Sequence, residues 1–127
     1  MSNVPCIVSV EDDQDLFEII RLTLASLPIQ LRHAKTGQEA IELLRHYQAD
    51  LLILDIMLPD INGWNVLKEI HTWERQPTSV IVLTAQTSAT HRVIAHLQDV
   101  TAYMTKPFMP KELREKVVEI LGLPVST

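Results

Sequence analysis

Acidic, hydroxyl and basic residues stand where the apolar runs of this sequence end. The acidic run Glu11–Asp13 follows the first apolar run, Asp55 follows the third, Thr84 the fourth and Lys106 the fifth. Carboxylates are hard oxygen ligands suited to Mg²⁺, and an aspartate can accept a phosphoryl group as a nucleophile. A hydroxyl can donate to a phosphoryl oxygen, and a lysine can pair with a carboxylate or a phosphate. These residue types favour metal-assisted phosphoryl chemistry.

Each residue also has a simpler interpretation when it is taken alone. In the segment LLILDIMLPDINGW, Asp55 ends a buried strand, where a charge is costly unless it is paired or bound to a metal. It could merely cap a loop. The run Glu11–Asp13 could be the acidic first turn of a helix, which the helix dipole favours. Their joint position at several strand ends argues for a shared site.

Five short apolar runs predict the strands that would position these residues. Those at Cys6–Val10, Leu51–Leu54 and Ser79–Leu83 are nearly continuous, as in central parallel strands that are covered on both faces. Ile29–Ala34 alternates between apolar and polar residues, as in an edge strand, and Thr101–Met104 is the fifth run.

Helical patterns follow each predicted strand. They cover Asp13–Leu27, Thr36–Tyr47, Asn62–His71, Ser88–Gln98 (with Val93, Ile94 and Leu97 as its weaker apolar set) and Lys111–Leu121. Thr36 and Glu39 form a predicted capping box, and Gly122 stands past the last helix. Strictly alternating strands and helices predict an α/β fold with a parallel sheet and helices on both faces. Sites in such folds form at the carboxyl ends of the strands.

Length and composition narrow the classes further. A chain of 127 residues fits one domain, and its net charge of −5 argues against direct binding of nucleic acid. The single cysteine, Cys6, excludes an internal disulfide bond and is expected to be buried in a strand. No apolar run approaches the roughly 20 residues of a membrane span, and the N-terminus has no signal-peptide pattern. We therefore expect a cytoplasmic protein.

At these residues the sequence resembles the response-regulator receiver domains of two-component signalling, the family of the chemotaxis regulator. The resemblance rests on VEDDQDL (10–16), LLILDIMLPDINGWNVL (51–67), VIVLTA (80–85) and AYMTKPF (102–108). It implies a doubly wound, flavodoxin-like sheet with strand order 2-1-3-4-5. The receiver domain would cover residues 1–122, with a loose tail over residues 123–127.

The resemblance also implies roles for individual residues. Asp55 would accept the phosphoryl group. Asp12 would bind Mg²⁺ directly, Glu11 would act mainly through metal-bound water, and Met57 would offer its backbone carbonyl. Mn²⁺ is an alternative metal.

The remaining roles belong to the fourth and fifth strand ends. Thr84 would bind a phosphoryl oxygen, and Lys106 would pair with it. Lys106–Pro107 would be a cis bond, in line with the confinement of cis peptides to bonds before proline. Tyr103 would swing inward when Thr84 moves.

The implied function is phosphorelay signalling rather than enzymatic turnover, with chemistry limited to self-phosphorylation and autodephosphorylation. The phosphoryl donor would be a sensor histidine kinase or a phosphotransfer protein. A downstream protein would bind the face formed by the fourth helix, fifth strand and fifth helix. The chain would be a monomer or a phosphorylation-dependent dimer. No effector domain follows residue 127, so output would use protein contacts, unless the chain is a receiver piece of a larger protein.

Several positions depart from the family pattern. Asp99-Val100 replaces a common Gly-Ala pair, although aspartate tolerates left-handed backbone better than most residues. Arg92 and Glu112 match one pair of a charged network found in DNA-binding relatives. Thr101 and Ala102 stand where aspartate is usual in that branch, which puts its dimer mode in question.

Two rival functions remain to be weighed. A phosphohydrolase of the haloacid dehalogenase type would need a second aspartate two residues after Asp55, where Met57 stands. A receiver-like module that acts without phosphorylation should lack one of the key residues, yet all are present. Met57 and Gln86 would flank the path of attacking water, and Met57 favours a long-lived phosphorylated form.

The aromatic and imidazole side chains suggest no further site. The five histidines show no metal-ligand spacing except the weak His91/His96 pair, which is five residues apart, and they are interpreted as solvated helix residues. Trp64 and Trp73 are interpreted as packing residues at the ends of the third helix.

Overall fold

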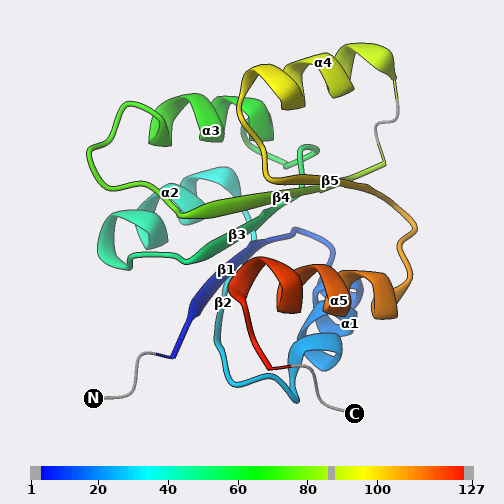
Figure 1. Cartoon of the computed structure of the whole chain (residues 1–127). Helices are drawn as coiled ribbons and strands as arrows, with labels where there is room; N and C mark the ends of the chain where they lie inside the picture. Colours follow the sequence, from blue (N-terminus) through cyan, green and yellow to red (C-terminus); the bar gives the residue numbers. More distant parts are fainter. Residues whose placement is uncertain (1–3, 86–87, 125–127) are drawn as a thin grey trace.

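A five-stranded parallel sheet forms the centre of the molecule (Figure 1). The computed structural model describes residues 4–85 and 88–124. The strands are β1 (Cys6–Val10), β2 (Gln30–Ala34), β3 (Leu51–Leu54), β4 (Ser79–Thr84) and β5 (Ala102–Thr105). Their order is β2-β1-β3-β4-β5, which confirms the predicted topology and the edge position of β2.

Five helices cover the two faces of this sheet. They are α1 (Gln14–Leu24), α2 (Gly37–His46), α3 (Gly63–Ile70), α4 (Ala89–Leu97) and α5 (Pro110–Leu121). Helices α1 and α5 lie on one face, whereas α2, α3 and α4 lie on the other (Figure 1). Every connection between parallel strands therefore crosses through a helix, as the alternating sequence pattern predicted.

Two hydrophobic clusters hold the layers together, one on each face of the sheet. Alternating side chains of the central strands divide between them: Leu52 and Leu54 pack with α2 and α3, whereas Leu51 and Ile53 pack with α1 and α5. Because side chains alternate along a strand, a shift by one residue would exchange the two sets. Both sets are buried, so the register of β3, and with it the direction of the following Asp55, is strongly specified.

Local capping determines where the helices begin. Asp13 caps α1 by accepting a hydrogen bond from Leu16 N, and Thr36 caps α2 by accepting one from Glu39 N. The predicted capping box is modified, because the Glu39 carboxylate accepts from Lys35 N rather than from Thr36 N. Helix α1 ends at Leu24, three residues earlier than predicted, since Leu27 N bonds to Leu24 O in a tighter turn.

Helix α4 differs from its predicted packing. Val93 and Leu97 were expected on its apolar face, but they are 57% and 76% exposed, and Ala95 is the buried residue. The turn after α4 follows the prediction, because Asp99 adopts left-handed backbone with φ 58° and Val100 N bonds to Ala95 O. Helix α4 therefore buries little of its surface against the sheet and exposes two large apolar side chains to solvent.

The first residues after α5 make defined contacts. Gly122 takes left-handed backbone with φ 65°, Leu123 N bonds to Val118 O, and Leu123 packs against the cluster of α1 and α5. The loose tail over residues 123–127 stays a prediction, since residues 125–127 lie outside the described ranges. Within those ranges, no helix has both the length and the apolar character needed to cross a bilayer.

Candidate functional site

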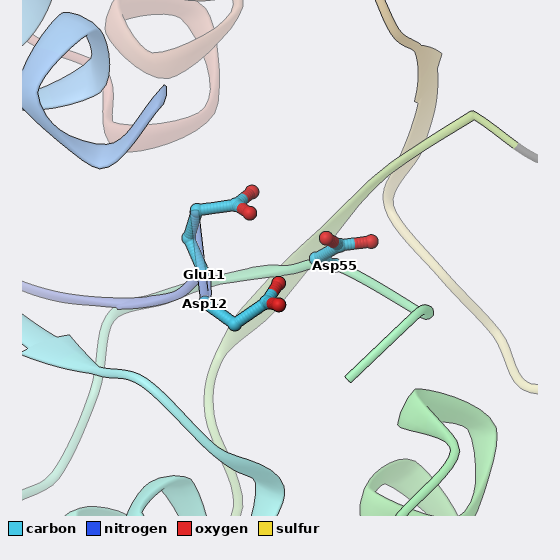
Figure 2. A group of neighbouring side chains, drawn as sticks. All are labelled: Glu11, Asp12 and Asp55. Carbon is cyan, nitrogen blue, oxygen red and sulfur yellow. The ribbon is translucent and has the colours of Figure 1, made fainter. Parts of the chain in front are cut away.

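Three carboxylates meet at the carboxyl edge of the sheet. Figure 2 shows Glu11 and Asp12 projecting from the loop after β1, and Asp55 from the end of β3. One oxygen of each residue lies within 4.8 Å of one oxygen of each of the others. The strand register explains the meeting, since Val10 and Leu54 are paired across β1 and β3, and each precedes an acidic residue.

Asp55 is held from three sides. Its N–H donates to Val10 O at 3.1 Å, which extends the pairing of β3 with β1 by one residue. Its Oδ1 accepts from Met57 N at 3.0 Å, and its Oδ2 accepts from Lys106 Nζ at 2.7 Å. The residue is only 4% exposed. The carboxylate is therefore oriented before any ligand arrives.

Lys106 joins two of the three carboxylates. Its Nζ lies 2.9 Å from Glu11 Oε1 and 2.7 Å from Asp55 Oδ2. The pKa of Glu11 is raised to about 7. Burial is the largest cause, and the negative charge of Asp55 adds to it, whereas the hydrogen bond from Lys106 acts in the opposite direction. Burial lowers the pKa of Lys106, but the hydrogen bonds to Asp55 and Glu11 outweigh that effect, so its pKa is raised. The cluster thus favours additional positive charge.

The end of β4 lies next to Lys106. Thr84 is fully buried, and its carbonyl accepts the N–H of Lys106 at 2.8 Å. The bond between Lys106 and Pro107 is cis, as the resemblance implied. This backbone hydrogen bond places Thr84 beside Lys106, whose side chain bonds to Glu11 and Asp55.

Tyr103 lies on β5, beyond this cluster and beside α4. The guanidinium carbon of Arg92 lies 5.3 Å from the centroid of the Tyr103 ring. Arg92, which the sequence assigned to a charged network, thus contacts the aromatic residue expected to move. Burial raises the pKa of the Tyr103 hydroxyl, and the positive charge of Arg92 lowers it.

The loop from Asp55 to Gly63 is anchored at both of its ends. A Cβ atom on Gly63 would lie 2.8 Å from Asp55 O, so only glycine allows this close approach. Asp60 accepts from Gly37 N at 2.8 Å and from Gln38 N at 2.9 Å, which ties the loop to the N-terminus of α2. The backbone carbonyl of Met57 therefore belongs to a constrained loop.

Three contacts near the site were missed from sequence. His33 lies half-buried on β2, bonds through Nε2 to Glu11 O at 2.7 Å and stacks on Phe17, so its interpretation as a solvated helix residue was wrong. Trp64 Nε1 donates to His91 Nδ1 at 3.0 Å, which links α3 to α4. The third is the bond between Asp60 and the start of α2, since Asp60 was recognised from sequence only as part of a turn. No local pattern marks any of these contacts, because both partners are known only after folding.

The donor set fits a hard divalent cation. Three carboxylates converge, and two of them are nearly inaccessible to solvent, whereas Asp12 is exposed. Lys106 pairs with Glu11 and Asp55, so its one positive charge is set against the three acidic groups of the cluster. Mg²⁺ takes oxygen ligands and commonly keeps several waters, so a half-open carboxylate cluster suits it.

Known proteins resemble this chain in sequence. The model of the response regulator receiver domain family matches residues 7–118. The transcriptional regulatory protein GltR of Pseudomonas aeruginosa is 32% identical over 121 residues, which are 94% of this chain and 50% of that protein. The transcriptional regulatory protein SrrA of Staphylococcus aureus is 31% identical over 121 residues, 95% of this chain and 49% of that protein. The chain thus spans about half the length of these relatives.

Solved structures agree with the fold. A response regulator receiver domain protein, described as CheY-like, from Methanospirillum hungatei superposes with a TM-score of 0.87 at 26% identity, covering 94% of this chain and 95% of that one. The receiver domain of Francisella response regulator 1452 superposes with a TM-score of 0.85 at 26% identity, covering 93% of this chain and 97% of that one.

Proposed function

The chain belongs to the response regulator receiver domain family, a family of phosphorelay signalling rather than catalysis, and from this premise we propose that Asp55 is its phosphoryl acceptor. The observation that carries the proposal is the buried Asp55 carboxylate, oriented by Lys106 and by Met57 N beside Glu11 and Asp12. The proposed receiver domain covers residues 1–122.

The proposed reaction is an in-line transfer. One carboxylate oxygen of Asp55 attacks the phosphorus atom of a phosphohistidine. The new phosphorus–oxygen bond forms as the phosphorus–nitrogen bond breaks, and the departing histidine takes up a proton. Lys106 then pairs with the phosphoryl oxygens, and the Thr84 hydroxyl donates to one of them. Burial of both partners strengthens these interactions, because the local dielectric is low.

The proposal assigns the metal to the same cluster. Asp12, Asp55 and the carbonyl of Met57 would hold Mg²⁺ directly and Glu11 through water, with Mn²⁺ as an alternative. Bound there, the cation supplies positive charge against the phosphoryl oxygens. The crowding of the carboxylates, and the pKa of about 7 that it helps to give Glu11, support this assignment.

The proposal also names a phosphoryl donor and an output face. The donor would be a sensor histidine kinase or a phosphotransfer protein. The proposed output face consists of α4, β5 and α5, where Val93 and Leu97 expose apolar surface and Arg92 covers Tyr103. A shift of Thr84 and Tyr103 after phosphorylation would change this face for a downstream protein.

Replacement of Asp55 by asparagine tests the proposal. The Asp55→Asn change is nearly isosteric, so the fold should persist while phosphoryl acceptance is lost. Mass spectrometry after treatment with acetyl phosphate and Mg²⁺ measures the adduct, and circular dichroism checks the fold. Asp13→Asn is the matched control, since Asp13 is exposed and asparagine can also cap α1.

The outcomes separate the rival functions. The proposal predicts one Mg²⁺-dependent adduct on the wild type and on the Asp13 variant, and none on Asp55→Asn. An equal adduct on the Asp55 variant would remove Asp55 from the central role. No adduct on the wild type would favour a module that acts without phosphorylation, whereas rapid turnover of small phosphoesters would favour a phosphohydrolase.

A further inference from the structure

The imidazole of His33 holds the backbone of the acidic loop from the neighbouring edge strand. Its Nε2 lies 2.7 Å from Glu11 O. A carbonyl oxygen can only accept a hydrogen bond, so Nε2 must carry the hydrogen and donate it. The adjacent residue of the same strand, Ala34, accepts the N–H of Glu11 at 2.9 Å. Strand β2 thus holds both backbone polar groups of Glu11.

The ring of His33 is itself held in place. It stacks on Phe17 of α1 with ring centroids 3.5 Å apart and planes 3° from parallel. Phe17 is buried, and its N–H donates to Asp13 O in the first turn of α1. The imidazole therefore lies against a rigid aromatic surface on one side and bonds to Glu11 O at its tip.

This contact determines the orientation of one particular peptide plane. Glu11 O and Asp12 N belong to the same rigid peptide unit. The hydrogen bond from His33 therefore also orients the backbone N of Asp12, to which its Cα is attached. The Glu11 side chain has other restraints, because Oε1 accepts from Lys106 and Oε2 from Asp13 N. The Asp12 side chain is exposed, so its direction depends more on the backbone that carries it.

We propose that His33 is a positioning residue that, through the Glu11 carbonyl, directs the Asp12 carboxylate toward the cation site. The inference rests on the proposed function, because it assumes that the cluster of Glu11, Asp12 and Asp55 binds Mg²⁺. His33 does not touch the cation in this scheme. Its contribution is to reduce the conformational freedom that Asp12 would lose when the cation binds.

Two substitutions at this position separate hydrogen bonding from packing. His33→Phe keeps an aromatic ring against Phe17 but removes the donor. His33→Gln removes the ring but places an amide N–H near the position of Nε2. The matched control is His46→Phe, because His46 also bonds a backbone carbonyl, Glu42 O at 2.8 Å, but lies on α2 and is exposed.

The experiment measures Mg²⁺ binding by tryptophan fluorescence and, separately, the urea midpoint of unfolding in EDTA. The proposal predicts a dissociation constant about fivefold weaker for His33→Phe, at least partial recovery for His33→Gln and no change for His46→Phe. Asp12→Ala should show the largest loss.

Several results would overturn the inference. A dissociation constant for His33→Phe equal to that of the wild type would do so, even if its urea midpoint falls, because the role would then be structural. A His33→Gln variant that binds no better than His33→Phe would exclude the donated hydrogen bond. If the wild type itself binds no Mg²⁺, the metal site of the proposed function fails, and this inference fails with it.

Discussion

Nζ of Lys106 lies 2.7 Å from Oδ2 of Asp55, although the two residues are 51 positions apart in the chain. The same ammonium group bonds Glu11, and the lysine side chain is only 18% exposed. Removing one partner of a buried ion pair leaves the other charge without compensation, which costs more than the pair contributed. Lys106 therefore has a structural role that can be measured without any phosphoryl chemistry.

Lys106→Met should lower the free energy of unfolding by about 2 kcal/mol in EDTA, because Glu11 and Asp55 would keep their buried charges without a cation. Urea denaturation measures this loss. Lys116→Met is the matched control, since Lys116 pairs with Glu119 at the surface, and should cost less than about 0.5 kcal/mol. Equal effects of the two substitutions would contradict a buried pair at Lys106.

Asp60→Ala should lower the free energy of unfolding by about 1 kcal/mol near neutral pH, because Gly37 N and Gln38 N at the start of α2 would lose their acceptor. Asp60→Asn keeps one acceptor oxygen and should lose less. Urea denaturation of the three proteins at several pH values tests both expectations.

The effect of Asp60 should also depend on pH. Slight burial raises the pKa of Asp60, but the hydrogen bonds from Gly37 N and Gln38 N outweigh it and hold the pKa below its usual value of 3.8. A lowered pKa in the folded state stabilises the protein above that usual value, and the stabilisation is lost as pH falls through the folded pKa. The difference between wild type and Asp60→Ala should therefore shrink in acid. A difference that grows in acid would contradict the bond to α2.

Met57→Asn should shorten the lifetime of the phosphorylated protein about fivefold, since a thioether orients water poorly and an amide can donate and accept. The Met57 side chain is 55% exposed beside Asp55, whose Oδ1 is bonded to Met57 N. Loss of radiolabelled phosphate after removal of the donor measures the decay rate. Gln86, the other residue expected near the water path, lies outside the described residues. Decay that is unchanged or slower in the variant would show that side chain 57 does not limit hydrolysis.

Beryllofluoride, which mimics a phosphoryl group, should change amide hydrogen exchange in α4 and β5. Helix α4 is weakly packed, with Ala95 as its buried residue, and Arg92 contacts Tyr103 directly. Few buried contacts permit local rearrangement at low cost. Helix α2 serves as the internal control, because it lies on the same face as α4 but beside β1 and β2, at the other end of the sheet from β5. A response confined to the loops around Asp55 would contradict the proposed output face.

Much of the fold follows from local pattern. Continuous apolar residues at Leu51–Leu54 predicted a covered strand, and Thr36 predicted the start of α2. Asp99 was expected to replace glycine in a left-handed turn and does so. These features depend on hydrophobic periodicity, capping and backbone preference, which act over a few neighbouring residues. The family motifs also predicted that Glu11, Asp12 and Asp55 lie at one edge of the sheet.

Tertiary packing alone decided how these residues meet. His33 has the alternation of an ordinary edge-strand residue, and only the pairing of β2 with β1 brings its imidazole to Glu11 O. The bonds of Lys106 to Glu11 and Asp55 span 95 and 51 positions. Val93 and Leu97 were wrongly predicted to face the sheet, because a weak apolar pattern does not specify which side of α4 meets it. Such contacts depend on the relative position of distant elements, which core packing determines and local sequence patterns do not encode.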